Sequence, residues 1–279
     1  MTVHHLDCCR MHPLGRRLLS GEGSVFERAT MVSHVLAVES KEGIVLVDSG
    51  IGMDDVKEPQ KRLGKSFLDG LRPELDESRT ALRQLEGLGY EARDVRHIVL
   101  THLDLDHAGG LSDFPDAHVH VLKSEYDAAT QRLTRNEAHR YRPIQWAHGP
   151  KWELHEVAGG ERFHGFERVR AIVEPDVLLL PAGGHTRGHA VVAVRTGDTW
   201  LAHAGDAYFH HGEVADPPHC PPGLALFQRM LSVDNAARVA NQTRLRELKR
   251  EAGGSVRVFC AHDEEEWASF TGASGARAS

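Results

Sequence analysis

Residues 101–110, with the sequence THLDLDHAGG, constrain this chain more than any other stretch because they place four potential metal ligands within six positions. They directly follow an apolar run at 95–100, whose length and β-branched residues predict a buried strand. The point where a strand opens into a loop commonly carries functional side chains. Histidine and aspartate are also ordinary residues of surface turns, but four of them at H-x-D-x-D-H spacing, closed by Ala-Gly-Gly, favour a metal site.

The size and composition of the chain favour one α/β domain. With 279 residues, of which 41% are hydrophobic, the chain can bury a substantial core, and no linker divides it. We therefore expect a single domain over residues 1–270. Residues 271–279 are small and polar, which predicts a disordered tail.

Charge and cysteine content exclude several classes of function. The net charge of −7 disfavours nucleic acid or an anionic membrane as a partner, so we expect a small-molecule substrate that is uncharged or cationic. The N-terminus has no basic segment followed by an apolar one, and no run approaches the ~18 apolar residues of a membrane span, which predicts a cytoplasmic protein. The four cysteines form no C-x-x-C pair and are expected to be thiols.

Apolar runs elsewhere predict further strands, several of which end in His or Asp. Two runs joined by the polar turn 40–42 predict a β-hairpin over 33–50, with Asp48 at its end. Periodicity and caps predict helices over 78–87 and 232–252. The other expected strands are 117–122, 177–181, 190–194, 199–207 and 255–261.

Three regions have no clear period. Residues 52–78 suggest a short helix or a mobile flap, and the proline-rich residues 216–223 a rigid loop. Residues 135–165 suggest a long loop or small helices bordering a pocket, although aromatic residues crowded into the core would leave the same pattern. His118 and His120, in one of the expected strands, are interpreted as half-exposed residues rather than ligands.

The polar strand ends together resemble a known family. Residues 184–189 (GHTRGH) are similar to the G-H-T-x-G-H element of the metallo-β-lactamase superfamily, and residues 102–107 resemble its H-x-H-x-D-H signature. Asp206 matches the bridging aspartate of the family, His262 its last histidine, and the stretch 47–50 its first motif. The resemblance covers residues 33–264 and implies an α/β fold that is a four-layer αββα sandwich of two mixed β-sheets flanked by helices.

The resemblance implies a dinuclear metal centre with seven ligands. His102, Asp104 and His185 would hold one ion, Asp106, His107 and His262 the other, and Asp206 would bridge them. Asp48 would orient a metal-bound histidine by accepting its hydrogen bond, and His189 would support its own turn. Zn²⁺ suits this mixture of imidazoles and carboxylates, but Asp104 stands where the family usually has histidine, which keeps Mn²⁺ or Fe open.

Such a centre predicts metal-assisted hydrolysis. In the expected mechanism a metal-bridging hydroxide attacks a polarised carbonyl, and Asp106 passes a proton to the leaving alkoxide. The expected catalytic residues are Asp106, Asp206 and Tyr208. The lactonases of the family carry a tyrosine three residues beyond the bridging aspartate, where this chain has Phe209, so either Tyr208 or Phe209 would face the substrate.

The lactonase-like branch is the preferred interpretation, with an acyl-homoserine lactone or a related cyclic ester as substrate. A glyoxalase II-like thioesterase or a small phosphodiesterase is the alternative with the same core. A di-iron redox protein is the alternative from a different class, and a non-catalytic member is disfavoured by the complete ligand set. We expect a monomer or a homodimer.

Overall fold

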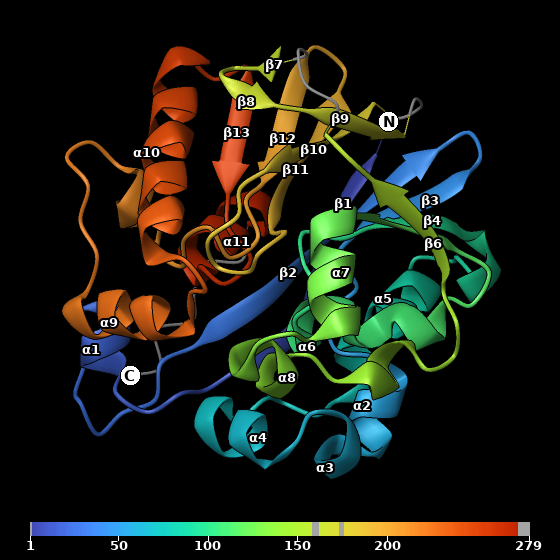
Figure 1. The fold of residues 1–279 in the computed structure, drawn as a ribbon, viewed down its shortest axis with the longest axis horizontal. Coiled ribbons are helices and arrows are strands. Elements are labelled where there is room, and N and C mark those ends of the chain that lie inside the picture. Colours follow the sequence, from blue (N-terminus) through green and yellow to red (C-terminus); the bar gives the residue numbers. More distant parts are fainter. Residues whose placement is uncertain (1, 158–161, 173–175, 273–279) are drawn as a thin grey trace.

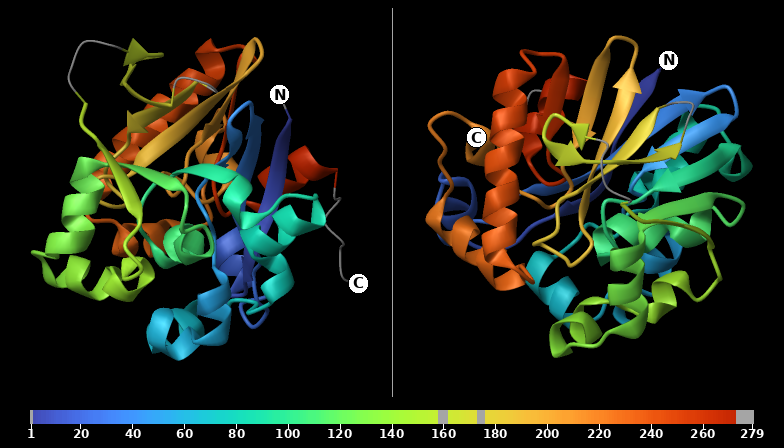
Figure 2. Two further views of the ribbon diagram at one scale, coloured as in Figure 1. Left: turned by 90° about the vertical axis from the view of Figure 1, so that its right-hand side faces the viewer. Right: turned by 45° about the horizontal axis from the view of Figure 1, so that its top comes forward.

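A computed structural model describes residues 2–157, 162–172 and 176–272. Two β-sheets lie face to face in the middle of the molecule, and helices cover both outer faces (Figure 1). Views from two other directions show the same layers, with the blue-to-green sheet on one side and the yellow-to-red sheet on the other (Figure 2). The fold is therefore the metallo-β-lactamase-type αββα sandwich that the resemblance implied.

The first sheet is built from the N-terminal half of the chain. Its strand order is β1 (Val3–Met11), β2 (Met31–Ser40), β3 (Gly43–Val47), β4 (Val95–Val99), β5 (His118–Leu122) and β6 (Lys151–His155). Strands β2 and β3 are antiparallel around the turn at 41–42, which confirms the predicted hairpin. Strands β3 to β6 are parallel, so the chain leaves β3 and β4 at the same edge of the sheet.

The second sheet is built from the C-terminal half. Its order is β13 (Val256–Phe259), β12 (Thr199–His203), β11 (Ala190–Thr196), β10 (Val177–Pro181) and β9 (Val169–Ile172). Only β12 and β13 are parallel within it, so both sheets are mixed. A separate two-stranded ladder pairs β7 (Arg162–Phe163) with β8 (Phe166–Glu167).

The helices are short except for the one that covers the second sheet. They are α1 (Arg16–Ser20), α2 (Met53–Lys57), α3 (Pro59–Arg62), α4 (Lys65–Leu71), α5 (Ala81–Gly87), α6 (Leu105–Ala108), α7 (Lys123–Gln131), α8 (Arg135–Arg140), α9 (Pro222–Leu231), α10 (Asn235–Glu251) and α11 (Glu264–Thr271). The 3₁₀ turns are η1 (Glu77–Arg79), η2 (Ala92–Asp94), η3 (Gly109–Asp113), η4 (Pro143–Trp146) and η5 (His211–Val214). The helices predicted over 78–87 and 232–252 are confirmed as α5 and α10, with Thr80 and Asp234 accepting the N-terminal backbone hydrogen bonds.

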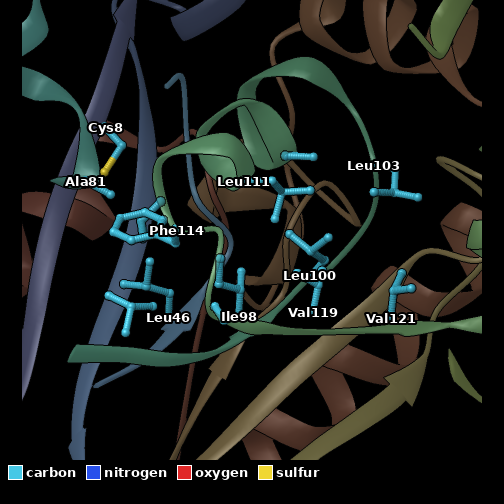
Figure 3. Packing of buried hydrophobic residues seen from close by; sticks show 14 of the residues in the cluster. Cys8, Leu46, Ala81, Ile98, Leu100, Leu103, Leu111, Phe114, Val119 and Val121 are labelled. Atoms are coloured by element: carbon cyan, nitrogen blue, oxygen red, sulfur yellow. The ribbon is translucent and has the colours of Figure 1, made fainter. Parts of the chain in front are cut away.

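Three buried clusters hold the four layers together. Between the two sheets, Val45, Val47 and Val99 pack against Leu179 and Val192. On the outer face of the first sheet, residues such as Ile98 and Val119 pack against η3 and α5 (Figure 3). On the outer face of the second sheet, Val191 and Val258 pack against Leu245 and Leu248 of α10. The alternation of side chains along each strand produces this arrangement, since successive residues point to opposite faces.

The structure corrects several expectations. The N-terminal segment, for which no strand was predicted, forms β1, and residues 52–78, expected as one short helix or a mobile flap, form three short helices and the turn η1. His118 is exposed but His120 is buried, where its ring lies between His97 and His155. Thr271 ends α11 and does not begin a tail, while residues 273–279 lie outside the described part of the chain. None of the helices in the described ranges is long and apolar enough to cross a membrane.

Candidate metal centre

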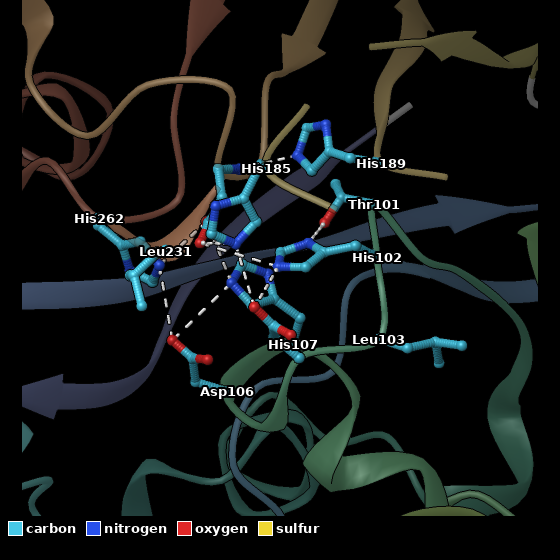
Figure 4. Close-up of polar contacts among 12 residues, drawn as sticks. Thr101, His102, Leu103, Asp106, His107, His185, His189, Leu231 and His262 are labelled. Atoms are coloured by element: carbon cyan, nitrogen blue, oxygen red, sulfur yellow. Dashed lines mark hydrogen bonds and ion pairs between the residues drawn. The ribbon is translucent and has the colours of Figure 1, made fainter. Parts of the chain in front are cut away.

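The structure brings the seven predicted ligands together where the strand ends of the two sheets meet. Figure 4 labels His102, Asp106, His107, His185 and His262 among them. Four ligands follow β4 in the first sheet. In the second sheet, one lies in the turn after β10, one follows β12 and one follows β13. They form two groups of mutually close ligand atoms: His102, Asp104, His185 and Asp206 in one, and Asp106, His107 and His262 in the other.

The first group surrounds Oδ2 of Asp104. This oxygen lies 3.0 Å from His185 Nε2 and 3.4 Å from His102 Nε2. Asp206 Oδ2 lies 3.3 Å from His185 Nε2 and 3.8 Å from His102 Nε2. Two imidazole nitrogens therefore face two carboxylate oxygens across one small space.

The second group uses the other oxygen of the shared aspartate. Asp206 Oδ1 lies 3.0 Å from His262 Nε2 and 3.2 Å from His107 Nε2. Asp106 Oδ2 lies 3.5 Å from His262 Nε2 and 3.8 Å from His107 Nε2. Because each oxygen of Asp206 faces a different pair of histidines, this carboxylate is placed to bridge two ions.

The donor set fits two divalent cations. His102 Nε2, His107 Nε2, Asp104 Oδ1 and Asp206 Oδ1 are buried without a hydrogen-bond partner, which is costly unless another ligand satisfies them. Burial and the nearby Arg140 guanidinium lower the pKa of His185 to about 4. Burial also disfavours the charged form of His107 and His262, but the carboxylates of Asp206 and Asp106 outweigh it and raise the pKa of both rings, so a bound ion would displace protons there. Mixed imidazole and carboxylate donors in four-coordinate sites are typical of Zn²⁺.

Asp48 holds the ligand loops in place from the end of β3. Its Oδ2 accepts a hydrogen bond from His107 Nδ1 at 2.8 Å, and its Oδ1 accepts the backbone N–H of Thr101 at 2.7 Å. Thr101 Oγ1 in turn lies 2.9 Å from His102 Nδ1. Asp48 adopts a left-handed backbone (φ 59°), a conformation that an aspartate tolerates when hydrogen bonds compensate. Asp48 thus contacts both His107 and the residue before His102, and its supporting role for a metal-bound histidine stays a prediction.

His189 supports the centre from behind and lies in neither group. Its Nδ1 donates to the carbonyl of Ala182 at 3.2 Å, and its Nε2 accepts the backbone N–H of Asp206 at 3.0 Å. Both ring nitrogens are therefore engaged in hydrogen bonds outside the two ligand groups. A Cβ on Gly205 would lie 2.7 Å from His189 Nε2, so glycine is required beside the bridging aspartate.

Arg140, which sequence reasoning missed, contacts the first group. Its Nη1 donates to the carbonyl of His185 at 3.0 Å and lies 3.5 Å from Asp104 Oδ2, while its Nη2 donates to the carbonyl of Leu231 at 2.6 Å. Burial raises the pKa of Asp104, but Arg140 and His102 outweigh burial and hold it well below the usual range. The carboxylate at this unusual position is therefore charged and paired.

Glu125 was also missed, and it joins two ligand loops. Its side chain is fully buried at the start of α7. Its Oε1 accepts the backbone N–H of Leu103 and the hydroxyl of Tyr141, at 3.0 and 2.9 Å, and its Oε2 accepts the backbone N–H of Gly188 at 3.0 Å. Leu103 lies between two ligands, and Gly188 belongs to the turn that carries His185. The only signal in the sequence was an acidic residue in an expected helix, which is too common to single out.

A cavity of about 840 Å³ opens onto the metal centre, and Asp104, Asp106, His185, Asp206 and His262 line its floor. Its walls come from the N-terminal segment and from α4, α8 and α9, and they are mostly apolar: Met11, Leu14, Leu19, Leu63, Phe67, Leu71, Phe227 and Leu231. Of the residues 135–165 that were expected to border a pocket, Asn136, His139, Arg140 and Arg142 line this cavity, in or next to α8. The described residues further along form η4, β6 and β7 and are not among those that line it.

Phe209, and not Tyr208, lines this cavity. Phe209 packs 4.9 Å from the ring of His262. Tyr208 is fully buried on the other side of the loop, where its hydroxyl donates to Glu266 of α11 at 3.0 Å. The structure therefore does not bring Tyr208 to the substrate, and the expected catalytic role conflicts with its position.

Comparison with known proteins agrees with this geometry. The family model described as "Metallo-beta-lactamase superfamily" matches residues 29–262. The chain is 42% identical over 267 residues to a Mycobacterium tuberculosis protein named "Probable metallo-hydrolase", with 95% of this chain and 81% of that protein covered. It is 28% identical over 160 residues to an N-acyl homoserine lactonase of Bacillus thuringiensis, covering 57% of this chain and 56% of the lactonase.

Solved structures share the fold at low sequence identity. An N-acyl homoserine lactone hydrolase with bound N-hexanoyl-L-homoserine has a TM-score of 0.71 and 21% identity, covering 96% of this chain and 95% of its own. A dizinc quorum-quenching lactonase has a TM-score of 0.60 and 19% identity, covering 94% and 87%. The match to the family model, the metallo-hydrolase relative and the buried His/Asp groups lead to one conclusion: this chain belongs to the metallo-β-lactamase superfamily and is a metal-dependent hydrolase.

Proposed function

We propose that this hydrolase holds two zinc ions and opens a lactone that carries an acyl chain, such as an N-acyl homoserine lactone. The observation that carries the substrate class is the cavity above the metal centre. Its volume is within the range of small-molecule sites, and its apolar walls suit an aliphatic chain while its floor is polar. The similarity to lactonases in sequence and fold supports the same class.

The residues at the floor of the cavity have different roles in the proposed reaction. Two ions held by the seven ligands would supply a nucleophile at neutral pH and polarise the ester carbonyl. In this proposal Asp106 passes a proton to the leaving alkoxide, and its position at the cavity floor supports that role. Phe209 packs against the ring of His262 where both line the cavity, so it adds apolar surface beside that ligand. No tyrosine is among the described residues that line the cavity, so no phenol assists the carbonyl in this proposal.

The expected partner is the substrate alone. The net charge of −7 argues against nucleic acid or an anionic membrane surface. We propose that the protein acts in the cytoplasm as a monomer or a homodimer. An acyl thioester would fit the same apolar walls, which makes thioester hydrolysis the competing activity.

The test is hydrolysis across lactones of increasing acyl length, acyl thioesters and phosphodiesters, together with metal analysis of the purified protein. We expect lactones to be the best substrates, with bound zinc and no oxidase activity. The variant Phe227→Ala should raise KM for long-chain lactones about tenfold, because it removes apolar surface from the cavity wall. Leu226→Ala is the matched control, since Leu226 is 58% exposed on the same helix. Hydrolysis of thioesters alone would contradict the lactone assignment. A coloured di-iron protein with oxidase activity would contradict both the lactone assignment and the assignment of zinc.

A further inference from the structure

Three histidine rings gather outside the dinuclear centre, at η5 and the proline-rich loop that follows it. His210, His211 and His219 each offer a ring nitrogen within 4.8 Å of the other two. The rings of His210 and His211 are stacked with centroids 4.3 Å apart, and His219 meets both edge-on, at 5.6 and 6.3 Å. None of these residues belongs to the metal centre described above, and the proposed hydrolysis does not use them.

The backbone brings His219 over the other two rings. The N–H of His219 donates to the carbonyl of Gly212 at 2.9 Å, which folds the proline-rich loop back onto η5. A Cβ on Gly212 would lie 2.5 Å from His219 Nε2, so only glycine leaves room for the ring at this place. The approach of the third histidine is therefore built into the local structure.

His211 is held in the way that metal-binding histidines usually are. Its Nδ1 donates to Asp263 Oδ2 at 2.9 Å, and its backbone N–H donates to the same oxygen at 2.7 Å. A carboxylate that fixes one ring nitrogen leaves the other free to bind a cation. That free nitrogen, Nε2, lies 3.6 Å from Glu265 Oε2, an exposed carboxylate that can complete a coordination sphere.

A simple ion pair explains only part of this cluster. The hydrogen bond to Asp263 raises the pKa of His211, so a protonated His211 between Asp263 and Glu265 would be stable by itself. Such a pair has no need of two more imidazoles, and a protonated His211 would repel them if they were charged. A cation shared by the three rings accounts for the whole arrangement.

We propose that His210, His211 and His219 bind a third divalent cation, with Glu265 as a fourth ligand. Three imidazoles and one carboxylate favour Zn²⁺, Ni²⁺, Co²⁺ or Cu²⁺ over Mg²⁺ or Ca²⁺. Binding displaces the proton from Nε2 of His211, which is released to solvent. His210 Nδ1 accepts the N–H of Gly212 at 3.0 Å, so the ion replaces either this hydrogen bond or the proton on the other nitrogen of the ring. The third site is therefore weaker than the buried centre.

The test is a zinc titration of tag-free holoprotein, followed by equilibrium dialysis and metal analysis. We expect two tightly held ions and a third with weaker affinity. His219→Gln should raise the Kd of the third ion by at least about tenfold and leave the first two in place, because even the loss of a residue that only orients a ligand costs that much. His118→Gln is the matched control, since His118 is also exposed but lies on β5, next to Glu153.

A second variant separates this proposal from the dinuclear centre. Asp206→Ala should lose ions from the buried centre and keep the weaker site. The proposal is overturned if the wild-type protein binds only two ions at every zinc concentration tested, or if His219→Gln binds the third ion as tightly as the wild type. Circular dichroism of each variant establishes that it is folded.

Discussion

Asp104 is the residue that distinguishes this metal centre, and the neighbouring Arg140 changes the net charge that Asp104 brings to it. A carboxylate in place of an imidazole adds a negative charge to the first group of ligands. The Arg140 guanidinium lies 3.5 Å from Asp104 Oδ2 and offsets part of that charge. The electrostatic balance of the site therefore resembles that of a neutral ligand, which is one reason to propose zinc.

The variant Asp104→His should keep the fold and shift the metal preference further toward Zn²⁺ over Mn²⁺, since imidazole is the softer ligand. Metal content after dialysis against an equimolar mixture of the two ions measures this preference. Asp69→His is the control, because Asp69 lines the same cavity but lies outside both ligand groups. Unchanged selectivity would show that Asp104 does not bind the ion.

Glu125 should matter for metal binding although it touches no ligand side chain. The two oxygens of Glu125 accept the backbone N–H groups of Leu103 and Gly188. A glutamine has one side-chain oxygen, so in Glu125→Gln one of these two N–H groups faces the amide NH₂ and loses its acceptor. We expect a loss of about 1–3 kcal/mol in the free energy of unfolding and about tenfold weaker metal binding.

Cobalt-substituted protein gives the measurement for Glu125, since its visible spectrum reports ligand geometry directly. Tyr141→Phe removes only the third donor to this carboxylate and is the control. A Glu125→Gln protein that is less stable but has the wild-type cobalt spectrum and affinity would reduce Glu125 to a role in stability alone.

At the scale of elements, the strands that end in polar residues could be predicted from the sequence, because an apolar run followed by His or Asp is a local pattern. The positions of β4 and β10 and of their ligands followed from it. Strand β1 could not be predicted, since its sequence, VHHLDCCRM, mixes polar and apolar residues and pairs through a register shift. Helix α9 was hidden by the prolines before it. Arg140 and Glu125 were out of reach because their partners lie 36 and 22 residues away.

The contact between η3 and α2 makes the stability depend on pH. Asp113 accepts the backbone N–H of Met53 at the start of α2, and burial raises the pKa of Asp113 to about 7. A carboxyl whose pKa is raised in the folded state stabilises the protein below its unfolded pKa of about 4 and loses that contribution as the pH rises through 7. We expect about 4 kcal/mol less stability at pH 8 than at pH 4 from this group, because each of the roughly three pH units between the two pKa values contributes about 1.4 kcal/mol.

Urea unfolding across this pH range measures the effect. Asp113→Asn keeps an acceptor for Met53 and should flatten the fall in stability between pH 4 and 8. Asp116→Asn changes an exposed neighbour and should leave the fall as it is. An Asp113→Asn protein with the same pH dependence as the wild type would contradict the assignment.

At the scale of the whole molecule, the metal centre joins the two sheets. Four ligands follow β4 of the first sheet and three come from the second sheet, so neither half carries a complete site. The apolar interface between the sheets sets their distance, and the ligands meet at its edge. A metal ion that binds only the folded state stabilises that state. Because the side chains that would hold the ions come from both sheets, bound ions would stabilise the interface between the sheets.

Removal of the ions should therefore lower the melting temperature. At 100 times the Kd, a bound ion contributes about 2.7 kcal/mol. For a domain of this size that corresponds to at least about 5 °C. Differential scanning calorimetry with and without a chelator measures the shift, and Asp206→Ala should show a much smaller one. An equal shift in this variant would place the stabilising ions elsewhere.

The division of the ligands between distant segments also sets an order of events during synthesis. Four ligands leave the ribosome with β4, but His262 follows β13, after both sheets have been made. A nascent chain folds from its N-terminal part onward, so the first sheet is made before the three ligands of the second sheet are present. The full set of seven ligands can therefore come together only after β13 of the second sheet has been made, long after the four ligands that follow β4.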